Sequence, residues 1–279
     1  MKTSCAEGCK IDFGCISRNW CCRGTDDKDT ETNEDTDPVP LQFGTSQWKC
    51  GPPILFLLLH RLPWAMFWLG YFIYDIQQRI SHEFYFEFVT KWNLIIVVLN
   101  ALVGLIVAAI MQAGRMREKW NHFLGFYWVL WSTASAIAPT VTLIFWALIY
   151  DPAKDNIDFI SIVTHVLNTV YTLLDVMVVA IPLRAYHFYY AEIVATIYII
   201  FSAIHEVTAN KLIYPVFNFQ EKPGPSMGFY FGGLVIEIAV WFCIFGLYKL
   251  RVFIAEKCDS CQRNMQVEDV ETQVVTTNV

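Results

Sequence analysis

Five polar residues recur through one long apolar stretch, DFISIVTHVLNTVYTLLDVMVVAIP, which covers residues 158–182. They follow one another at steps of four, three, four and three residues: Ser161, His165, Asn168, Thr172 and Asp175. This spacing puts all five side chains on one face of a helix. Polar groups inside a membrane span normally face the bundle interior or a water-filled cavity. Two interpretations stay open: hydrogen bonding between helices, or a catalytic or ligand-binding cavity that these residues line.

Three further polar residues lie where other apolar stretches begin or end, namely Thr90, His205 and Glu206. A threonine hydroxyl is a weak nucleophile that needs a base within hydrogen-bonding reach, and His165 or His205 could act as that base. All three residues would then belong to the same cavity. A simpler role for Thr90 is to cap the start of a helix, and His205 and Glu206 could form a hydrogen-bonded pair at the membrane interface.

The composition predicts an integral membrane protein. Of the 279 residues, 55% are hydrophobic and only 16% are charged, and the mean hydropathy is +0.39. A soluble domain of this length needs more polar surface. The net charge of -6 and the lack of a basic stripe argue against a nucleic-acid partner. Membrane lipids are therefore the expected surroundings, and the oligomeric state stays open.

Six apolar segments are long enough to position these residues as membrane-spanning helices, which need roughly 20 residues each. They cover residues 53–74, 92–112, 123–150, 158–182, 188–206 and 227–250. The expected fold is all-α, a polytopic bundle of about six transmembrane helices that forms one domain, residues 53–250. Residues 1–52 form a cysteine-rich, acidic tail without apolar periodicity, which predicts disorder. Residues 251–279 form a second tail.

Lysine and arginine are concentrated in the two tails and in the connections on the same side of the membrane. Positive charge favours the cytosolic side, so both termini are predicted to be cytosolic in a multi-pass protein of the plasma membrane. Arg61 interrupts the first span, and we expect its side chain to reach out to the cytosolic headgroups.

The tails carry two candidate modification or docking sites. Cys50 lies next to the membrane, where reversible S-acylation of cysteine is common. The chain ends in Thr277-Asn278-Val279, a form that fits the groove of a PDZ-domain protein. No standard metal-ligand spacing or cofactor motif occurs, so neither a metal nor a cofactor is expected.

Several short blocks resemble the rolling stone family of multi-pass membrane proteins, which is associated with myoblast fusion in insects. They occur in the same order over about residues 46–250 and leave the tails uncovered. The blocks are Ser46-Gln47-Trp48, Phe88-Val89-Thr90-Lys91-Trp92-Asn93-Leu94, Ala138-Pro139, Phe145-Trp146, Ile149-Tyr150, His165-x-x-Asn168 with Asp175, and Ile213-Tyr214-Pro215-Val216-Phe217.

More distantly, the same core is similar to the androgen-induced membrane hydrolases, which cleave fatty-acid esters of hydroxy fatty acids. The resemblance implies Thr90 as nucleophile, because their Phe-Leu-Thr-x-x-Asp block aligns with Phe88–Asn93. Their Asn-His-x-x-His block aligns with Thr164–Asn168, so Asn168 stands where their catalytic histidine is expected. An asparagine cannot usefully take up a proton, and His165 would have to serve as a displaced base.

These observations favour a non-enzymatic, rolling stone-like membrane protein that acts in cell-surface or fusion-related processes, as the resemblance implies. The first alternative is an intramembrane threonine hydrolase of lipid esters. The second is an ion or proton transporter that uses Asp175, Glu192 and Glu237, although no span is visibly broken and no inverted repeat is apparent.

Overall fold

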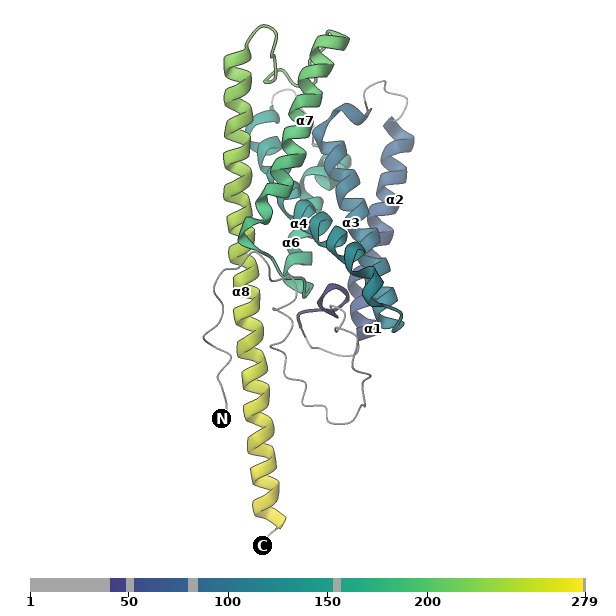
Figure 1. Ribbon diagram of the computed structural model, residues 1–279, viewed down its shortest axis with the longest axis vertical. Coiled ribbons are helices and arrows are strands. Elements are labelled where there is room, and N and C mark those ends of the chain that lie inside the picture. The colour runs from purple at the N-terminus through teal and green to yellow at the C-terminus, as the bar shows by residue number, and fades with distance from the viewer. Residues whose placement is uncertain (1–40, 49–52, 80–84, 153–156, 278–279) are drawn as a thin grey trace.

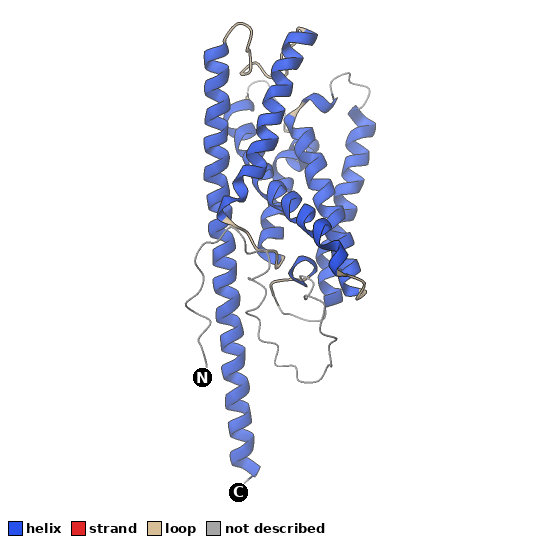
Figure 2. Ribbon diagram, viewed as in Figure 1, coloured by secondary structure: helices blue, strands red, loops and turns tan. Residues whose placement is uncertain are grey.

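A computed structural model of the chain describes residues 41–48, 53–79, 85–152 and 157–277. Within these ranges the chain is helical and forms no β-strand (Figure 2). Six helices are long and apolar enough to cross a membrane. They cover Ile54–Gln78, Val89–Gln112, Asn121–Ile149, Phe159–Val178, Ala185–Ala209 and Pro223–Lys257. The predicted all-α, polytopic fold with six spans is therefore confirmed.

Three of the six spans contain a π-helical turn, which the sequence did not reveal. The α-helices are α1 (Pro53–Phe56), α2 (Leu62–Arg79), α3 (Val89–Gln112), α4 (Asn121–Ile144), α5 (Phe159–Ile162), α6 (Asn168–Val178), α7 (Phe188–Ala209) and α8 (Pro223–Thr277). The π-helical turns are η3 (Leu57–Arg61), η6 (Phe145–Ile149) and η7 (Val163–Leu167). The 3-10 turns are η2 (Leu41–Gly44), η4 (Tyr85–Glu87), η5 (Glu118–Trp120) and η8 (Ala185–His187). π-helical turns inside α-helices often occur at functional positions.

Helix α4 lies at the centre of the bundle and packs against α3, α6, α7 and α8. Its middle is rich in small residues, and Ala134, Ala136 and Ala138 are completely buried. Small residues let neighbouring membrane helices approach closely. The hydroxyls of Ser135 and Thr140 donate to carbonyls four residues earlier in α4, so these buried polar groups are satisfied within the helix itself.

The two ends of the bundle differ. We call the end that carries the α7–α8 connection, residues 210–222, the loop face, and the end from which α8 projects the tail face (Figure 1). Residues 45–47 run along the tail face beside the end of α6. There the Gln47 amide donates to the Val178 carbonyl at 2.8 Å, and the Ala180 amide donates to the Thr45 carbonyl at 3.0 Å. The fourth span therefore ends at Val178, four residues before the predicted end.

Candidate functional site

Asp175 on α6 is the acid of the predicted polar face, and it is fully buried. Its Oδ1 accepts a hydrogen bond from Arg61 at 2.9 Å and lies 2.7 Å from His60 Nε2. Its Oδ2 accepts one from Trp131 at 2.7 Å. The prediction that Arg61 reaches the headgroups is wrong: only 2% of the residue is exposed, because the buried carboxylate binds the guanidinium inside the bundle.

Arg61 adds a second contact with α4 to this network and brings the network next to α3. It donates to the Tyr127 hydroxyl on α4 at 2.7 Å, and it passes directly beside Gly104 on α3. A Cβ atom at Gly104 would lie 2.7 Å from the Tyr127 hydroxyl and 2.9 Å from the guanidinium. The first four spans therefore meet around one buried ion pair, which has the geometry of a structural anchor.

The other polar residues of the fourth span bond mainly within their own helix or to α4. Asn168 accepts hydrogen bonds at Oδ1 from the Thr169 amide, at 2.6 Å, and from Thr142 of α4, at 3.2 Å. Thr172 donates to the Thr169 carbonyl at 3.1 Å. Ser161 lies at the start of α5, where its hydroxyl donates to Asp158 at 2.6 Å.

His165 lies in the π-helical turn η7 and packs flat against Phe145. The two ring centroids are 3.5 Å apart and the rings are nearly parallel, at 2°. The buried Nδ1 atom has no hydrogen-bond partner among the described residues. The Trp146 indole donates to the His165 backbone carbonyl at 3.3 Å. His165 is thus held by aromatic packing, with no hydroxyl bonded to its Nδ1.

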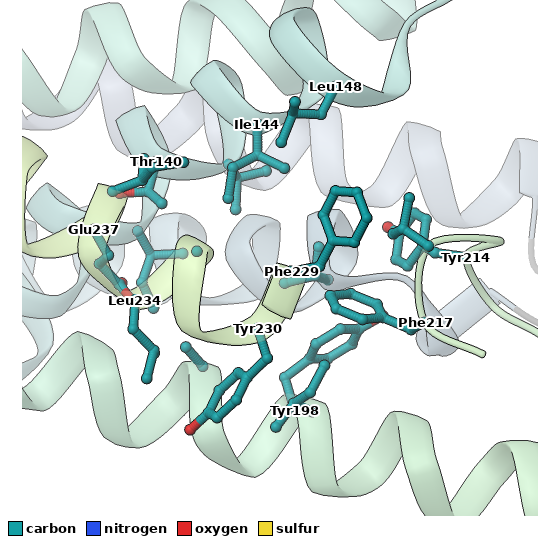
Figure 3. Close-up of a pocket in the computed structure, with 18 of the residues that line it drawn as sticks. Thr140, Ile144, Leu148, Tyr198, Tyr214, Phe217, Phe229, Tyr230, Leu234 and Glu237 are labelled. Carbon is teal, nitrogen blue, oxygen red and sulfur yellow. The ribbon is translucent and has the colours of Figure 1, made fainter. Parts of the chain in front are cut away.

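A pocket of about 480 Å³ opens between α3, α4, α7 and α8, a size typical of small-molecule sites. Its walls are almost entirely apolar. Figure 3 shows Thr140 and Glu237 at one end, and Tyr214 and Phe217 of the α7–α8 connection at the other. Thr90 and Asn93 on α3 also line this pocket.

Thr90 is the second residue of α3, and the residue that caps the helix is Phe88, so the prediction of a capping role is wrong. Thr90 and Tyr214 of the α7–α8 connection line the same pocket. Burial raises the pKa of Tyr214 to about 12, although Thr90 and Tyr198 lower it somewhat. The Tyr214 phenol is therefore neutral near pH 7 and can both donate and accept a hydrogen bond in the pocket.

His205 and Glu206 have separate partners rather than each other. His205 Nε2 lies 2.8 Å from Glu87 Oε1, which connects α7 to η4, the turn before α3. Glu206 accepts hydrogen bonds from the backbone amides of Phe219, at 2.7 Å, and Gln220, at 3.0 Å. Both residues thus fix the loop face of the bundle.

The predicted site residues therefore fall into three groups. Thr90 lines the pocket. His205 and Glu206, each with its own partners, lie near it at the loop face. His165 does not line the pocket. Asp175 belongs to the ion-pair network at the other end of its helix. The structure does not join Thr90 to His165 by a hydrogen bond within the described ranges.

Two further polar residues line the pocket, although neither was predicted to share a cavity with Thr90. Asn93 is 1% exposed, and neither atom of its amide has a hydrogen-bond partner among the described residues. Glu237 is 3% exposed and lines the same pocket. Each is a single polar residue in an apolar span, a signal that was present in the sequence.

Several predictions fall on residues outside the described ranges: the tail before residue 41, the acylation candidate Cys50, and Asn278 and Val279 of the PDZ-binding candidate. The remaining residue of that candidate, Thr277, is the last residue of α8. In the described part of the chain, no group of three or more His, Cys, Asp or Glu residues is arranged to hold a metal ion.

Comparison with known proteins gives one consistent result. The family model described as "Protein rolling stone" matches residues 37–262. The chain is 25% identical over 228 residues to the protein rolling stone of Drosophila melanogaster, a match that covers 75% of this chain and 82% of the Drosophila protein. No solved structure matches the chain.

Proposed function

The chain belongs to the rolling stone family of membrane proteins, and from this premise we propose that it acts without catalysis, as a plasma-membrane protein in cell-surface processes related to membrane and myoblast fusion. In this proposal both termini are cytosolic. The loop face, with residues 85–88 and 210–222, is then the surface that another cell or membrane meets.

One observation carries the non-enzymatic part of this proposal. A threonine nucleophile needs a base within hydrogen-bonding reach, but Thr90 lines the pocket and His165 does not. His165 instead lies flat on Phe145. At the position where a catalytic histidine is expected, Asn168 uses Oδ1 to accept hydrogen bonds from Thr142 and Thr169.

A cell-fusion assay tests the role. Two cell populations that carry halves of a split reporter are mixed, and content mixing is compared with and without expression of this protein. We expect expression to increase mixing, and Thr90→Ala and His165→Ala to mix as well as the wild type at equal surface levels. Mixing equal to that of cells without the protein would contradict the proposal.

A second candidate function, lipid-ester hydrolysis, is favoured by the position of Thr90 on the wall of an apolar pocket. Membranes that contain the protein are assayed with a fatty-acid ester of a hydroxy fatty acid. We expect no hydrolysis above that of control membranes. Hydrolysis that disappears in Thr90→Ala would replace the non-enzymatic proposal with lipid-ester hydrolysis. Hydrolysis that appears only in Asn168→His would identify an enzyme scaffold that lacks its base.

A further inference from the structure

The wall that α8 contributes to the pocket contains three glycines. Gly228, Gly232 and Gly233 line the pocket, and a Cβ atom built at any of the three would meet no atom within 4 Å. Glycine weakens a helix interior relative to alanine. Here its missing side chain leaves open space along one face of α8, next to α4 and α7.

The walls of the pocket suit an apolar molecule. Aromatic rings from five segments line it, including Trp92 of α3, Tyr198 of α7 and Phe229 of α8. Aliphatic side chains of α4 complete the wall. Pockets of this kind bind small apolar ligands and use a few polar groups to orient them. In a membrane protein, the surrounding bilayer supplies such molecules as lipids.

Asn93 supplies the polar group whose chemistry selects the ligand. Both its amide nitrogen and its amide oxygen are buried without a partner among the described residues. A buried polar atom that lacks a hydrogen bond is costly. A ligand that bonds both atoms must therefore accept one hydrogen bond and donate another.

Three common lipid groups differ in this respect. A carboxylate accepts hydrogen bonds but has no proton to donate to Asn93 Oδ1, and an ammonium group donates but cannot accept from Nδ2. A hydroxyl does both. Of these three groups, only the hydroxyl can satisfy both amide atoms of Asn93.

We propose that the pocket between α3, α4, α7 and α8 binds a neutral lipid that carries a hydroxyl group, and that this hydroxyl bonds the amide of Asn93. Asn93 is the fifth residue of α3, so it lies roughly 6 Å from the start of the helix at 1.5 Å per residue. This depth is close to the membrane surface, where the hydroxyl of a lipid normally lies. A sterol and a long-chain alcohol share this chemistry, and both are tested.

The test is photolabelling of the full-length protein in membranes with a sterol that carries a diazirine and an alkyne. The unlabelled competitors form two pairs, and the members of each pair differ only in the polar group: the sterol and the same ring system as a hydrocarbon, and oleyl alcohol and oleate. We expect the sterol to compete roughly tenfold better than the hydrocarbon, the effect of one net hydrogen bond. If oleyl alcohol matches the sterol, the hydroxyl is recognised and the ring system is not. Equal competition by the hydrocarbon or by oleate would overturn the proposal.

Two variants localise the label. Gly233→Leu fills the pocket from α8 and is expected to reduce labelling at least fivefold. Gly246→Leu is the matched control. Gly246 lies in the same helix outside the pocket, and no atom lies within 4 Å of its Cβ position. Asn93→Leu should abolish the difference between sterol and hydrocarbon while the protein stays folded, since it removes only unpartnered atoms. Undiminished labelling of Gly233→Leu would overturn the proposal. If Gly233→Leu does not fold, Gly228→Val is used in its place.

Labelling is also measured in Thr90→Ala. We expect Thr90→Ala to keep the roughly tenfold preference for the sterol over the hydrocarbon, because the hydroxyl is assigned to Asn93. The total labelling is not used as the readout here, because Thr90 lines the pocket. This arm separates the lipid site from the proposed function: hydrolysis that depends on Thr90 would end the non-enzymatic proposal and leave the binding result standing. Loss of this preference in Thr90→Ala, with the preference kept in Asn93→Leu, would move the hydroxyl to Thr90 and overturn the assignment to Asn93.

Discussion

At the scale of single residues, the carboxyl group of Asp175 offers the clearest test, because it holds Arg61, His60 and Trp131 inside the bundle. Asp175→Leu leaves the buried guanidinium of Arg61 without its counter-ion. We expect the free energy of unfolding to fall by about 3–5 kcal/mol, the usual cost of breaking a buried pair. Unfolding of the purified protein in mixed micelles measures this loss.

The double variant Arg61→Met/Asp175→Leu is the control for this prediction. Replacing both charges by apolar groups removes the uncompensated charge, so the double variant should be more stable than Asp175→Leu alone. A double variant as unstable as the sum of both single variants would show that the two residues act independently.

Gly104 tests the packing around the same ion pair. Gly104→Ala puts a methyl group 2.7 Å from the Tyr127 hydroxyl and 2.9 Å from Arg61, so one of them must move. We expect a loss of about 1–3 kcal/mol of stability, as for other overpacked cores. Gly70→Ala on α2 has no atom within 4 Å of the new carbon and should leave the melting temperature unchanged or slightly higher. Equal melting temperatures for both variants would contradict this reading of Gly104.

At the scale of elements, Arg251 of α8 fixes the end of α6. Its guanidinium donates to the carbonyls of Val176, Val179 and Ile181, and a cation at this position also suits the negative end of the helix. Arg251→Lys keeps the charge but loses the planar fork of donors. We expect amide hydrogen exchange to become faster over residues 176–181.

The exposed neighbour Lys249 provides the comparison for Arg251. Its ammonium group lies over the rings of Phe245 and Tyr248 rather than at the end of α6. Lys249→Ala should therefore leave exchange over residues 176–181 unchanged. Faster exchange in both variants would mean that α8 as a whole, and not the guanidinium, supports α6.

At the scale of the whole molecule, six spans place the two described ends of the chain on one side of the membrane. Residues 45–47 contact the tail face, and α8 projects from that face (Figure 1). With cytosolic termini, an epitope inserted after Lys211 should bind antibody on intact cells, and an N-terminal epitope only after permeabilisation. The reverse pattern would place the loop face in the cytosol and contradict the proposed orientation.

The sequence alone determined the membrane class, the number of spans and the family. A bilayer admits only segments that satisfy their own backbone hydrogen bonds, so length and hydropathy are enough to locate six helices. The spacing in the fourth span likewise identified a polar face: His165, Asn168, Thr172 and Asp175 are all buried. The π-helical turns were not predicted, because a turn with one extra residue does not change the mean hydropathy of the span.

Only the tertiary structure decided which polar groups meet. Arg61 and Asp175 are 114 residues apart in the chain, and nothing local to either residue indicates the other. The same holds for the pocket, which needs the glycines of α8 opposite Asn93 of α3. Helical periodicity fixes the face on which a residue lies, whereas the partner of that face depends on how the helices pack around α4.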